Sequence, residues 1–508
     1  MKYPIHVLVW ILSSALLLAA QESAVKTPAL DRQERLAAIR FEPCEVPGTA
    51  PNKKEKALCG RYEVFEDRIK KAGRRISLKI VVFPASGPNK EPDPLFYIAG
   101  GPGSSATEDA PYIAANLASI RERRDLVFLD QRGTGESNQL FCEFFDRSDL
   151  QSYLGHWNPL DQVGKCRKEL EAKADLRLYG TELAMDDLDD VRSAMGLKKI
   201  NLYGASYGTR AALTYIRRHG QNVRAAWLHG VAPPDQFMPR DFPQHTERAL
   251  NGVISECLAD IACRNAFPNI EREAKSVLAT LMKEPVEVEV KMPPNRDVPT
   301  RVKLSRDLAA EAVRYMLYHP GPSGRIPLVL HLAAEGNFRP LAEAAINYRQ
   351  QIVATGATGL YISITCAEDL PGIKEGEGER NGVNTFLGDY RLRDQREGCE
   401  LWPRAEVSKD YNAPLRSNVP VLIVTGQWDP VTPPLYGDRT AKGFPNSLHV
   451  VVPSGGHGLG ALIGLDCVSK LTSTFIEKGT VKDLDATCVK NIRREGFLLR
   501  FPEPKPGQ

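Results

Sequence analysis

The sequence has almost no excess of charge of either sign. Its 508 residues include 66 Lys and Arg and 63 Asp and Glu, which leaves a formal net charge of +3 at pH 7. Because basic and acidic residues are nearly equal in number, the sequence does not indicate the strongly basic surface with which proteins attract nucleic acid or acidic membranes. We therefore expect neither nucleic acid nor a membrane surface among the partners of this chain.

The motifs of metal and nucleotide sites are also missing. The sequence contains no Cys/His spacing of the zinc type, no Walker loop and no long low-complexity run. We therefore expect no metal and no organic cofactor. Beyond the N-terminus, no segment is apolar enough to cross a membrane. The composition is that of an ordinary globular protein, and the length allows more than one folding unit.

Residues 1–20 have the layout of a secretory signal peptide. Lys2 gives a positive start, a mostly apolar run extends from Ile5 to Ala20, and polar residues begin at Gln21. An uncleaved anchor is the alternative, but the run is short for a bilayer span. We predict export to the periplasm or the medium, with cleavage after Ala20 or Ala24 and no stable membrane insertion afterwards.

The cysteines agree with export, because disulfides form in oxidising compartments. There are ten, an even number. The alternative is a set of ten reduced, buried thiols, which the predicted signal peptide disfavours. Sequence does not determine connectivity, but joining sequence neighbours gives loops of modest size. The predicted pairs are Cys44–Cys59, Cys142–Cys166, Cys257–Cys263, Cys366–Cys399 and Cys467–Cys488.

Up to about residue 235, short apolar runs alternate with helical patterns. Residues 25–60 read as irregular, and a hairpin is predicted for 61–66 and 76–84. A helix is predicted at 181–196, with Thr181 as its N-cap, and another extends from the turn at 204–208 to about His219. Short apolar runs bounded by turn residues are typical of buried parallel strands. The runs that fit are 95–99, 126–129, 199–203 and 225–228. This alternation predicts an α/β fold with a mostly parallel central sheet and flanking helices.

From about residue 236 to 415 the pattern becomes mainly helical. Strand-like runs here are limited to 286–290 and the region of Tyr361 to Ile364, and the clearest helices are 244–260, 269–283 and 305–318. Strand patterns return at 419–424 and 448–452, before a helix over about 467–476. An insertion between two parts of one sheet domain explains this order. We predict a first core part at 25–235, a helical cap at 236–415 and a C-terminal core part at 416–495.

One pentapeptide has the pattern of a nucleophile elbow. Gly204-Ala205-Ser206-Tyr207-Gly208 fits G-x-S-x-G, follows an apolar strand and precedes a helix rich in small residues. The glycines are needed because the turn is tight, and their missing side chains let the serine hydroxyl stand clear of the sheet. A structural Gly-Ser turn is the alternative. We predict Ser206 as a nucleophile.

A serine nucleophile needs a base and an acid that orients the base. His457 lies in the glycine-rich loop Ser454–Gly458, directly after the predicted strand 448–452. Asp429 follows the strand 419–424, at the sheet edge where active-site loops gather. In the fold that carries this elbow, the triad residues occur along the chain in the order serine, acid, histidine. We therefore predict Asp429 and His457 as the partners of Ser206. An ordinary Asp-Pro turn and a solvated loop histidine are the alternatives.

The developing oxyanion requires backbone donors. We predict the N–H of Tyr207, the residue after the nucleophile, as one donor. The other comes from the glycines of Gly100-Gly101-Pro102-Gly103, among which Gly101 is preferred. The sequence Asp130–Gly135 is interpreted as support, with an Asp–Arg pair that holds the oxyanion loop.

Taken together, these motifs resemble the prolyl iminopeptidase and tripeptidyl aminopeptidase family of α/β-hydrolase serine peptidases. The resemblance includes Asp189-Asp190-Val191-Arg192, Thr425–Pro433 and the Cys366-Ala367-Glu368 segment of the C-terminal region, and it covers nearly the whole mature chain. One departure is Ala99, where the family often has histidine before Gly-Gly-Pro-Gly. That change weakens the match to strict prolyl iminopeptidases but leaves the backbone donors in place.

The resemblance implies an exopeptidase that acts on peptide substrates with a free N-terminus, beneath a helical cap. It also implies a cap carboxylate for the substrate ammonium, because a buried ammonium needs an anionic partner. Glu368 is the candidate by position and Asp369 a weaker one, and a surface acidic pair is the alternative. An esterase or other acyl hydrolase of the same fold remains a second hypothesis, and a non-catalytic binding protein a third, because fold does not determine substrate.

Overall fold

The computed structural model describes residues 39–50, 52–293 and 298–502. The predicted signal peptide lies outside the described residues. At the centre of the structure is a nine-stranded sheet in the order β1-β2-β3-β5-β4-β6-β7-β10-β11. Pairing is antiparallel from β1 to β5 and parallel from β5 to β11, as predicted for an α/β fold. The strands are β1 (Glu42–Pro47), β2 (Lys54–Phe65), β3 (Arg75–Phe83), β4 (Leu95–Ile98), β5 (Leu126–Leu129), β6 (Ile200–Ala205), β7 (Val223–His229), β10 (Val421–Gly426) and β11 (Ser447–Val452).

The prediction of an irregular stretch over 25–60 is wrong for its second half. β1 and the start of β2 form an antiparallel pair there, in which Glu42 lies opposite Cys59 and Pro47 opposite Lys54. β1 lies at the edge of the sheet and β2 pairs beside it, and most side chains of both strands are exposed or half-buried. The apolar alternation that reveals a strand is therefore absent from this part of the sequence.

Helices cover both faces of the sheet, and successive strand residues alternate between two hydrophobic clusters. In β4, Phe96 and Ile98 belong to one cluster, while Leu95 and Tyr97 belong to the other. The first cluster includes α5 (Thr181–Ala194) and α6 (Tyr207–His219), and the second includes α2 (Ala106–Asn116) and α18 (Asp466–Lys478). Burial on both faces explains why the strands β4 to β7 read as continuous apolar runs.

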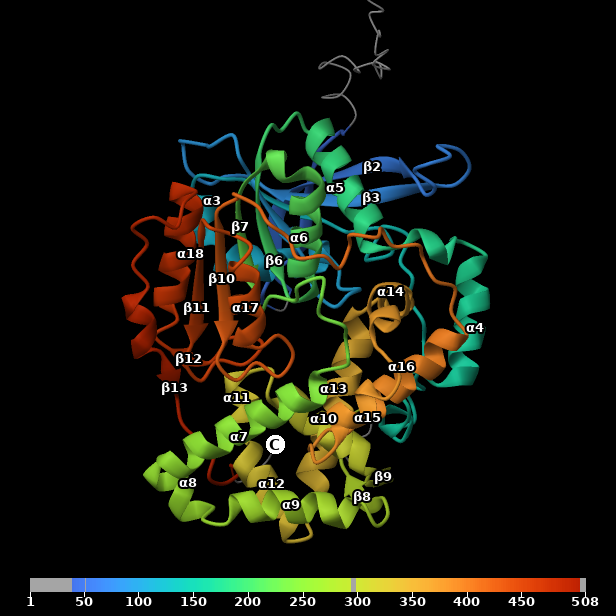
Figure 1. The fold of residues 1–508 in the computed structure, drawn as a ribbon, viewed down its shortest axis with the longest axis vertical. Helices are drawn as coiled ribbons and strands as arrows, with labels where there is room; N and C mark the ends of the chain where they lie inside the picture. The colour runs from blue at the N-terminus through green and yellow to red at the C-terminus, as the bar shows by residue number, and fades with distance from the viewer. Residues whose placement is uncertain (1–38, 51, 294–297, 503–508) are drawn as a thin grey trace, which may run out of the picture.

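The cap lies between β7 and β10 in the sequence. Figure 1 shows its helices gathered beyond the C-terminal ends of β10 and β11, where the loops after the strands also lie. Its helices are α7 (Phe242–Ala259), α8 (Ile261–Ala266), α9 (Ile270–Leu281), α10 (Arg306–Met316), α11 (Pro320–Ser323), α12 (Ile326–Ala334), α13 (Arg339–Thr355), α14 (Thr358–Ile364), α15 (Glu377–Gly382) and α16 (Tyr390–Glu400). A hairpin of β8 (Val286–Val290) and β9 (Thr300–Leu304) completes it. Outside the cap lie α3 (Ala118–Arg121), α4 (Leu160–Glu171), α17 (Pro434–Ala441), β12 (Leu462–Ile463) and β13 (Arg493–Arg494).

Two local predictions need correction. Tyr361 to Ile364 is the end of α14 rather than a strand. A short run of buried apolar and β-branched residues does not distinguish a strand from a buried helix, which explains this error. Thr181 is the first residue of α5, and Gly180 occupies the N-cap position. The Thr181 hydroxyl bonds to Glu368 and Tyr207 instead of capping the helix.

The ten cysteines form five disulfides, with the pairing predicted from sequence neighbours. Two of the bonds lie inside the cap, one between α7 and α8 (Cys257–Cys263) and one between the turn after α14 and α16 (Cys366–Cys399). A chain with five disulfides is typical of proteins that fold in an oxidising compartment. None of the described helices is long and apolar enough to span a bilayer.

Candidate active site

Ser206 stands at the sharp turn between β6 and α6. Its backbone has a positive φ of 55°, and its N–H donates to the carbonyl of His229 on the neighbouring strand. The flanking glycines are required by close backbone contacts. A Cβ on Gly208 would lie 2.0 Å from the carbonyl oxygen of Ile98, and one on Gly204 would lie 2.5 Å from that of Gly208. The turn therefore packs tightly against the end of β4 and holds the serine hydroxyl at the sheet edge.

A continuous hydrogen-bond chain joins the three predicted triad residues. The Ser206 hydroxyl lies 2.8 Å from Nε2 of His457, and Nδ1 of His457 lies 2.8 Å from Oδ2 of Asp429. The contact on Nδ1 assigns the proton of the neutral ring to that nitrogen, which leaves Nε2 free to accept the serine proton. This is the geometry that activates a serine hydroxyl.

Asp429 is fully buried and strongly stabilised as an anion. Burial alone would raise the pKa of this carboxyl group, but the contact with His457 and hydrogen bonds from Thr432 lower the pKa to about 2. Its Oδ1 accepts the N–H groups of Val431 and Thr432, each at 2.8 Å. Its Oδ2 also accepts the Thr432 hydroxyl at 2.7 Å. The carboxylate is thus fixed in place by the turn that follows β10.

The histidine loop is held by the cap. The N–H of Gly458 donates to the carbonyl of Tyr318 at 2.7 Å, and the Tyr318 ring meets the His457 ring edge to face at 5.1 Å. A Cβ on Gly456 would lie 2.4 Å from the carbonyl oxygen of Leu317, so only glycine allows this approach. The segment after α10 therefore positions the imidazole. Burial lowers the pKa of the nearby His229 to about 4, so this second histidine is uncharged at neutral pH.

The two predicted oxyanion donors both adjoin the nucleophile. Tyr207 follows Ser206 directly, and Gly101 lines the same cavity as Ser206. Gly101 has a φ of +110°, a conformation that favours glycine. A Cβ on Gly100 would lie 3.1 Å from the Cβ of Ser206, so the glycine loop passes close to the serine. The donor role of Gly101 and Tyr207 stays a prediction.

Asp130 supports this loop, but not through the Asp–Arg pair that we predicted. Its carboxylate accepts the hydroxyl of Ser105 at 2.7 Å and the N–H and hydroxyl of Thr107 at 3.0 and 2.8 Å. These bonds fix the start of α2, directly after the glycine loop. Arg132 points elsewhere and pairs with Asp187 at 2.6 Å, because Asp187 is the buried carboxylate that faces it from α5.

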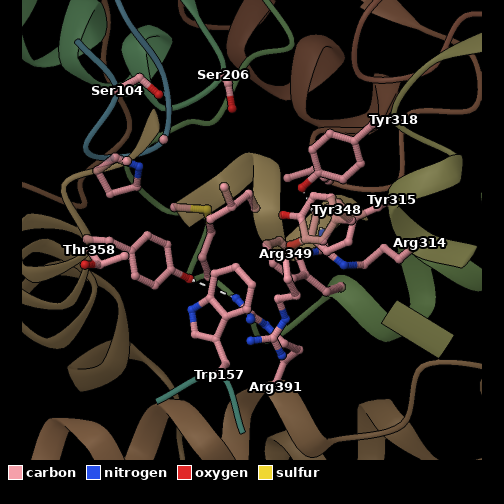
Figure 2. Close-up of a pocket in the computed structure, with 18 of the residues that line it drawn as sticks. Ser104, Trp157, Ser206, Arg314, Tyr315, Tyr318, Tyr348, Arg349, Thr358 and Arg391 are labelled. Carbon is pink, nitrogen blue, oxygen red and sulfur yellow. Dashed lines mark hydrogen bonds between the residues drawn. The ribbon is translucent and has the colours of Figure 1, made fainter. Parts of the chain in front are cut away.

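A cavity of about 320 Å³ opens next to Ser206 and His457 and extends under the cap. Figure 2 shows Ser206 at one end of this space and Trp157 with Arg391 at the other, while Tyr315, Tyr318 and Tyr348 lie along one side. The space is within the range of small-molecule and short-peptide sites. Within the described ranges, no three His, Cys, Asp or Glu side chains come together as a metal site would require.

Glu368 and Asp369 do not reach the cavity, which corrects their predicted role. Glu368 accepts the N–H of Thr181 at 2.7 Å, the Thr181 hydroxyl at 2.8 Å and the hydroxyl of Tyr411. Asp369 pairs with the fully buried Arg210 at 2.8 Å. Neither side chain lines the cavity, because the π-helical turn Thr365–Asp369 directs both toward α5 and α6. Both carboxylates are structural and are not available to a substrate ammonium.

Most of the cavity wall and one neighbour of the triad were not predicted from the sequence. The neighbour is Thr432, whose hydroxyl lies 3.0 Å from Nδ1 of His457 and also bonds to Asp429. The arginines Arg314, Arg349 and Arg391 of the wall were not predicted either. One signal was available, since α10 carries charged residues inside an otherwise apolar run. Charged residues on a buried helix face indicate either a structural ion pair or a binding site.

Comparison with known proteins matches two stretches of the chain to families. Residues 93–279 match the family described as alpha/beta hydrolase fold, and residues 384–488 match the family described as TAP-like protein. Together the stretches cover more than half of the chain. The chain belongs to the prolyl iminopeptidase and tripeptidyl aminopeptidase family of α/β-hydrolases. It is therefore a serine hydrolase, and the fold predicted from its sequence is confirmed.

Curated proteins and solved structures that are similar to this chain include named peptidases. The serine protease Hip1 of Mycobacterium bovis is 24% identical over 486 residues, which cover 89% of this chain and 91% of the relative. The tripeptidyl aminopeptidase of Streptomyces lividans is 27% identical over 214 residues, which cover 39% of each chain. Among solved structures, the proline iminopeptidase of Mycobacterium smegmatis is 14% identical, with a TM-score of 0.37 over 82% of this chain and 98% of that one.

Proposed function

We propose that this chain is an exported serine aminopeptidase, of the prolyl or tripeptidyl type, that hydrolyses peptide bonds near free N-termini. The observation that carries the proposal is the chain of two 2.8 Å contacts from Ser206 through His457 to Asp429. The named activities of two relatives, a serine protease and a tripeptidyl aminopeptidase, support the choice of a peptide substrate. Five disulfides support export.

The proposed reaction follows from the geometry. Nε2 of His457 takes the proton of Ser206 as the serine oxygen attacks the scissile carbonyl, and buried Asp429 stabilises the imidazolium that forms. The N–H groups of Gly101 and Tyr207 donate to the oxyanion of the tetrahedral intermediate. His457 then gives its proton to the leaving amine. Water deacylates Ser206 by the same route in reverse.

The cavity supports cleavage near the end of a chain. A space of about 320 Å³ beneath the cap holds a short piece of peptide rather than a long extended segment. The arginines at its far end repel an ammonium group, so we expect the free N-terminus to lie closer to Ser206 than to Arg391. This placement replaces the predicted contact with Glu368 or Asp369.

The second candidate is an esterase or other acyl hydrolase of the same fold. One observation favours it, since the described cavity lining includes no carboxylate to neutralise a substrate ammonium. The third hypothesis, a non-catalytic binding protein, is disfavoured by the intact Ser206–His457–Asp429 chain, since inactive hydrolase scaffolds usually lose a triad member.

Release of a fluorophore from unblocked and N-acetylated proline, alanine and tripeptide substrates tests the proposal. An aminopeptidase cleaves the unblocked substrates, fails on their acetylated forms and loses activity in Ser206→Ala. Equal cleavage of blocked and unblocked substrates would refute the aminopeptidase proposal. Cleavage of short-chain esters without any peptide cleavage would favour the esterase.

A further inference from the structure

The end of the cavity opposite Ser206 is lined by positive charge. Arg314, Arg349 and Arg391 all contribute to the lining, and the described lining contains no Asp or Glu. Figure 2 shows Arg349 and Arg391 near the ring of Trp157, and Arg314 to one side, next to Tyr315. They belong to α10, α13 and α16, three helices of the cap that each contribute one arginine to the cavity wall.

One carboxylate partly offsets this charge. Glu311 accepts from Nε and Nη2 of Arg314 at 3.0 and 2.9 Å, which makes a bidentate pair. Burial alone would raise the pKa of Glu311, but Arg314 and Arg391 lower it to about 2, so Glu311 is ionised at neutral pH. Arg391 lies 3.7 Å from the same carboxylate. Three guanidinium groups thus share one anion, and two positive charges are left over.

A second acid on α16 is engaged elsewhere. Asp394 lies one helical turn after Arg391 on α16, but its carboxylate accepts the N–H of Asn158 at 2.8 Å and lies 3.1 Å from Nδ1 of His156. Arg349 makes two long hydrogen bonds, to the carbonyls of His156 at 3.5 Å and Gly155 at 3.3 Å. Neither interaction supplies a counter-charge to Arg349.

The two remaining arginines have unused hydrogen-bond donors. Arg349 is 1% exposed and Arg391 is 5% exposed. Nε of Arg349, and Nε and Nη1 of Arg391, are buried without a hydrogen-bond partner. A buried charged donor without a hydrogen-bond partner is costly. Such donors in a cavity wall are suited to an incoming anion.

Aromatic rings hold these arginines in a fixed orientation. The guanidinium carbon of Arg391 lies 4.0 Å from the centre of the Trp157 ring, and that of Arg349 lies 4.5 Å from the same centre. Arg391 also donates to the hydroxyl of Tyr361 at 3.2 Å. Stacking on an aromatic face fixes the plane of a guanidinium, and a fixed plane favours bidentate binding of a carboxylate.

We propose that Arg349 and Arg391, stacked on Trp157, form a binding site for a carboxylate group of the substrate. The proposal deepens the proposed peptidase function and rests on it. The carboxylate belongs to the part of the substrate that fills the cavity, either as an acidic side chain or as the free C-terminus of a short peptide. The enzyme therefore prefers substrates that carry an anionic group within a few residues of the scissile bond.

Matched peptides test this preference. One series places Glu or Gln at each of the three residues before the scissile bond, and a second compares free C-terminal acids with amides in short peptides. We expect about tenfold to hundredfold higher kcat/KM for the acidic member at one position, mainly through a lower KM. The series that shows the preference identifies the source of the carboxylate. Equal or higher kcat/KM for the neutral member throughout would overturn the proposal.

Variants assign the preference to the site. Arg391→Gln and Arg349→Gln should each reduce the preference for the acidic member at least tenfold, through a higher KM for that member. Arg393→Gln is the matched control, because Arg393 lies on the same helix with its side chain 57% exposed. It should retain the wild-type preference. An undiminished preference in both site variants would refute the assignment.

A protection assay separates failure of this site from failure of the peptidase proposal. N-acetylglutamate should slow the labelling of wild-type Ser206 by a fluorophosphonate probe, and N-acetylglutaminamide, which carries no carboxylate, should not do so at the same concentration. This result does not depend on peptide cleavage or on the folding of a variant. Labelling that is equally fast with both compounds would contradict a carboxylate site, whether or not peptides are cleaved.

Discussion

Replacement of Asp429 by Asn tests the electrostatic part of the proposed mechanism. The substitution keeps the shape of the side chain but removes its charge beside the imidazolium that forms in the reaction. Two unit charges about 4 Å apart interact by ~4 kcal/mol at an effective dielectric constant of about 20. Because ~1.4 kcal/mol corresponds to a tenfold change in rate, we expect kcat to fall roughly a thousandfold.

A second effect acts in the same direction. Oδ1 of Asp429 accepts two backbone N–H groups, so the oxygen of an asparagine would keep that position and its amide nitrogen would face His457. That nitrogen donates to Nδ1 and favours the tautomer with the proton on Nε2, which no longer accepts from Ser206. The thousandfold loss in kcat is therefore a lower limit.

The assay is the kcat of the best peptide substrate, measured together with the rate of fluorophosphonate labelling. Thr432→Val is the matched control, because it removes one hydrogen bond to Asp429 and leaves the charge in place. We expect a loss of about tenfold in this control. An Asp429→Asn enzyme with kcat within tenfold of the wild type would refute the role assigned to Asp429.

Three further predictions concern structure and stability. Gly208→Ala should destabilise the fold by about 1–3 kcal/mol and abolish most activity, because the new Cβ would lie 2.0 Å from the carbonyl oxygen of Ile98. Gly164→Ala is the control, because the space around its Cβ is open, and it should stabilise the fold slightly. Urea unfolding measures both effects on stability. Glu368→Gln should lower the free energy of unfolding by about 1–3 kcal/mol but leave the ratio of unblocked to acetylated cleavage unchanged, and a selective loss of unblocked cleavage would restore Glu368 as an ammonium ligand. Burial lowers the pKa of His245 from 6.5 to about 4, so between these pH values the unfolded chain binds a proton that the folded chain does not. Unfolding free energy should therefore decrease as the pH falls from about 6.5 to 4, and His245→Gln should flatten this decrease.

The central sheet and the three reactive residues could be predicted because each leaves a local mark in the sequence. Ser206 and Asp429 each follow a buried strand, and such strands read as continuous apolar runs. His457 follows the edge strand β11, which ends in the apolar run Val450 to Val452. In parallel strands the C-terminal ends lie at one sheet edge, so three distant segments could be placed together. The edge strand β1 left no such mark, because most of its side chains face solvent.

The cavity wall could not be predicted in the same way. Arg349 of α13 and Arg391 of α16 come together over the ring of Trp157, and local periodicity does not predict such tertiary contacts. The orientation of Glu368 depends on a π-helical turn, which shifts the register of the side chains that follow it. From sequence alone, a carboxylate two residues after Cys366 could face the cavity or the core, and the structure places it in the core.

Covalent labelling of Ser206 tests the central claim most directly. The folded, disulfide-bonded protein is treated with a fluorophosphonate, digested, and analysed by mass spectrometry for the modified residue. The account predicts one adduct, on Ser206, with peptide hydrolysis lost in proportion to labelling and no adduct in Ser206→Ala. An unlabelled Ser206, or hydrolysis that survives complete labelling, would contradict it.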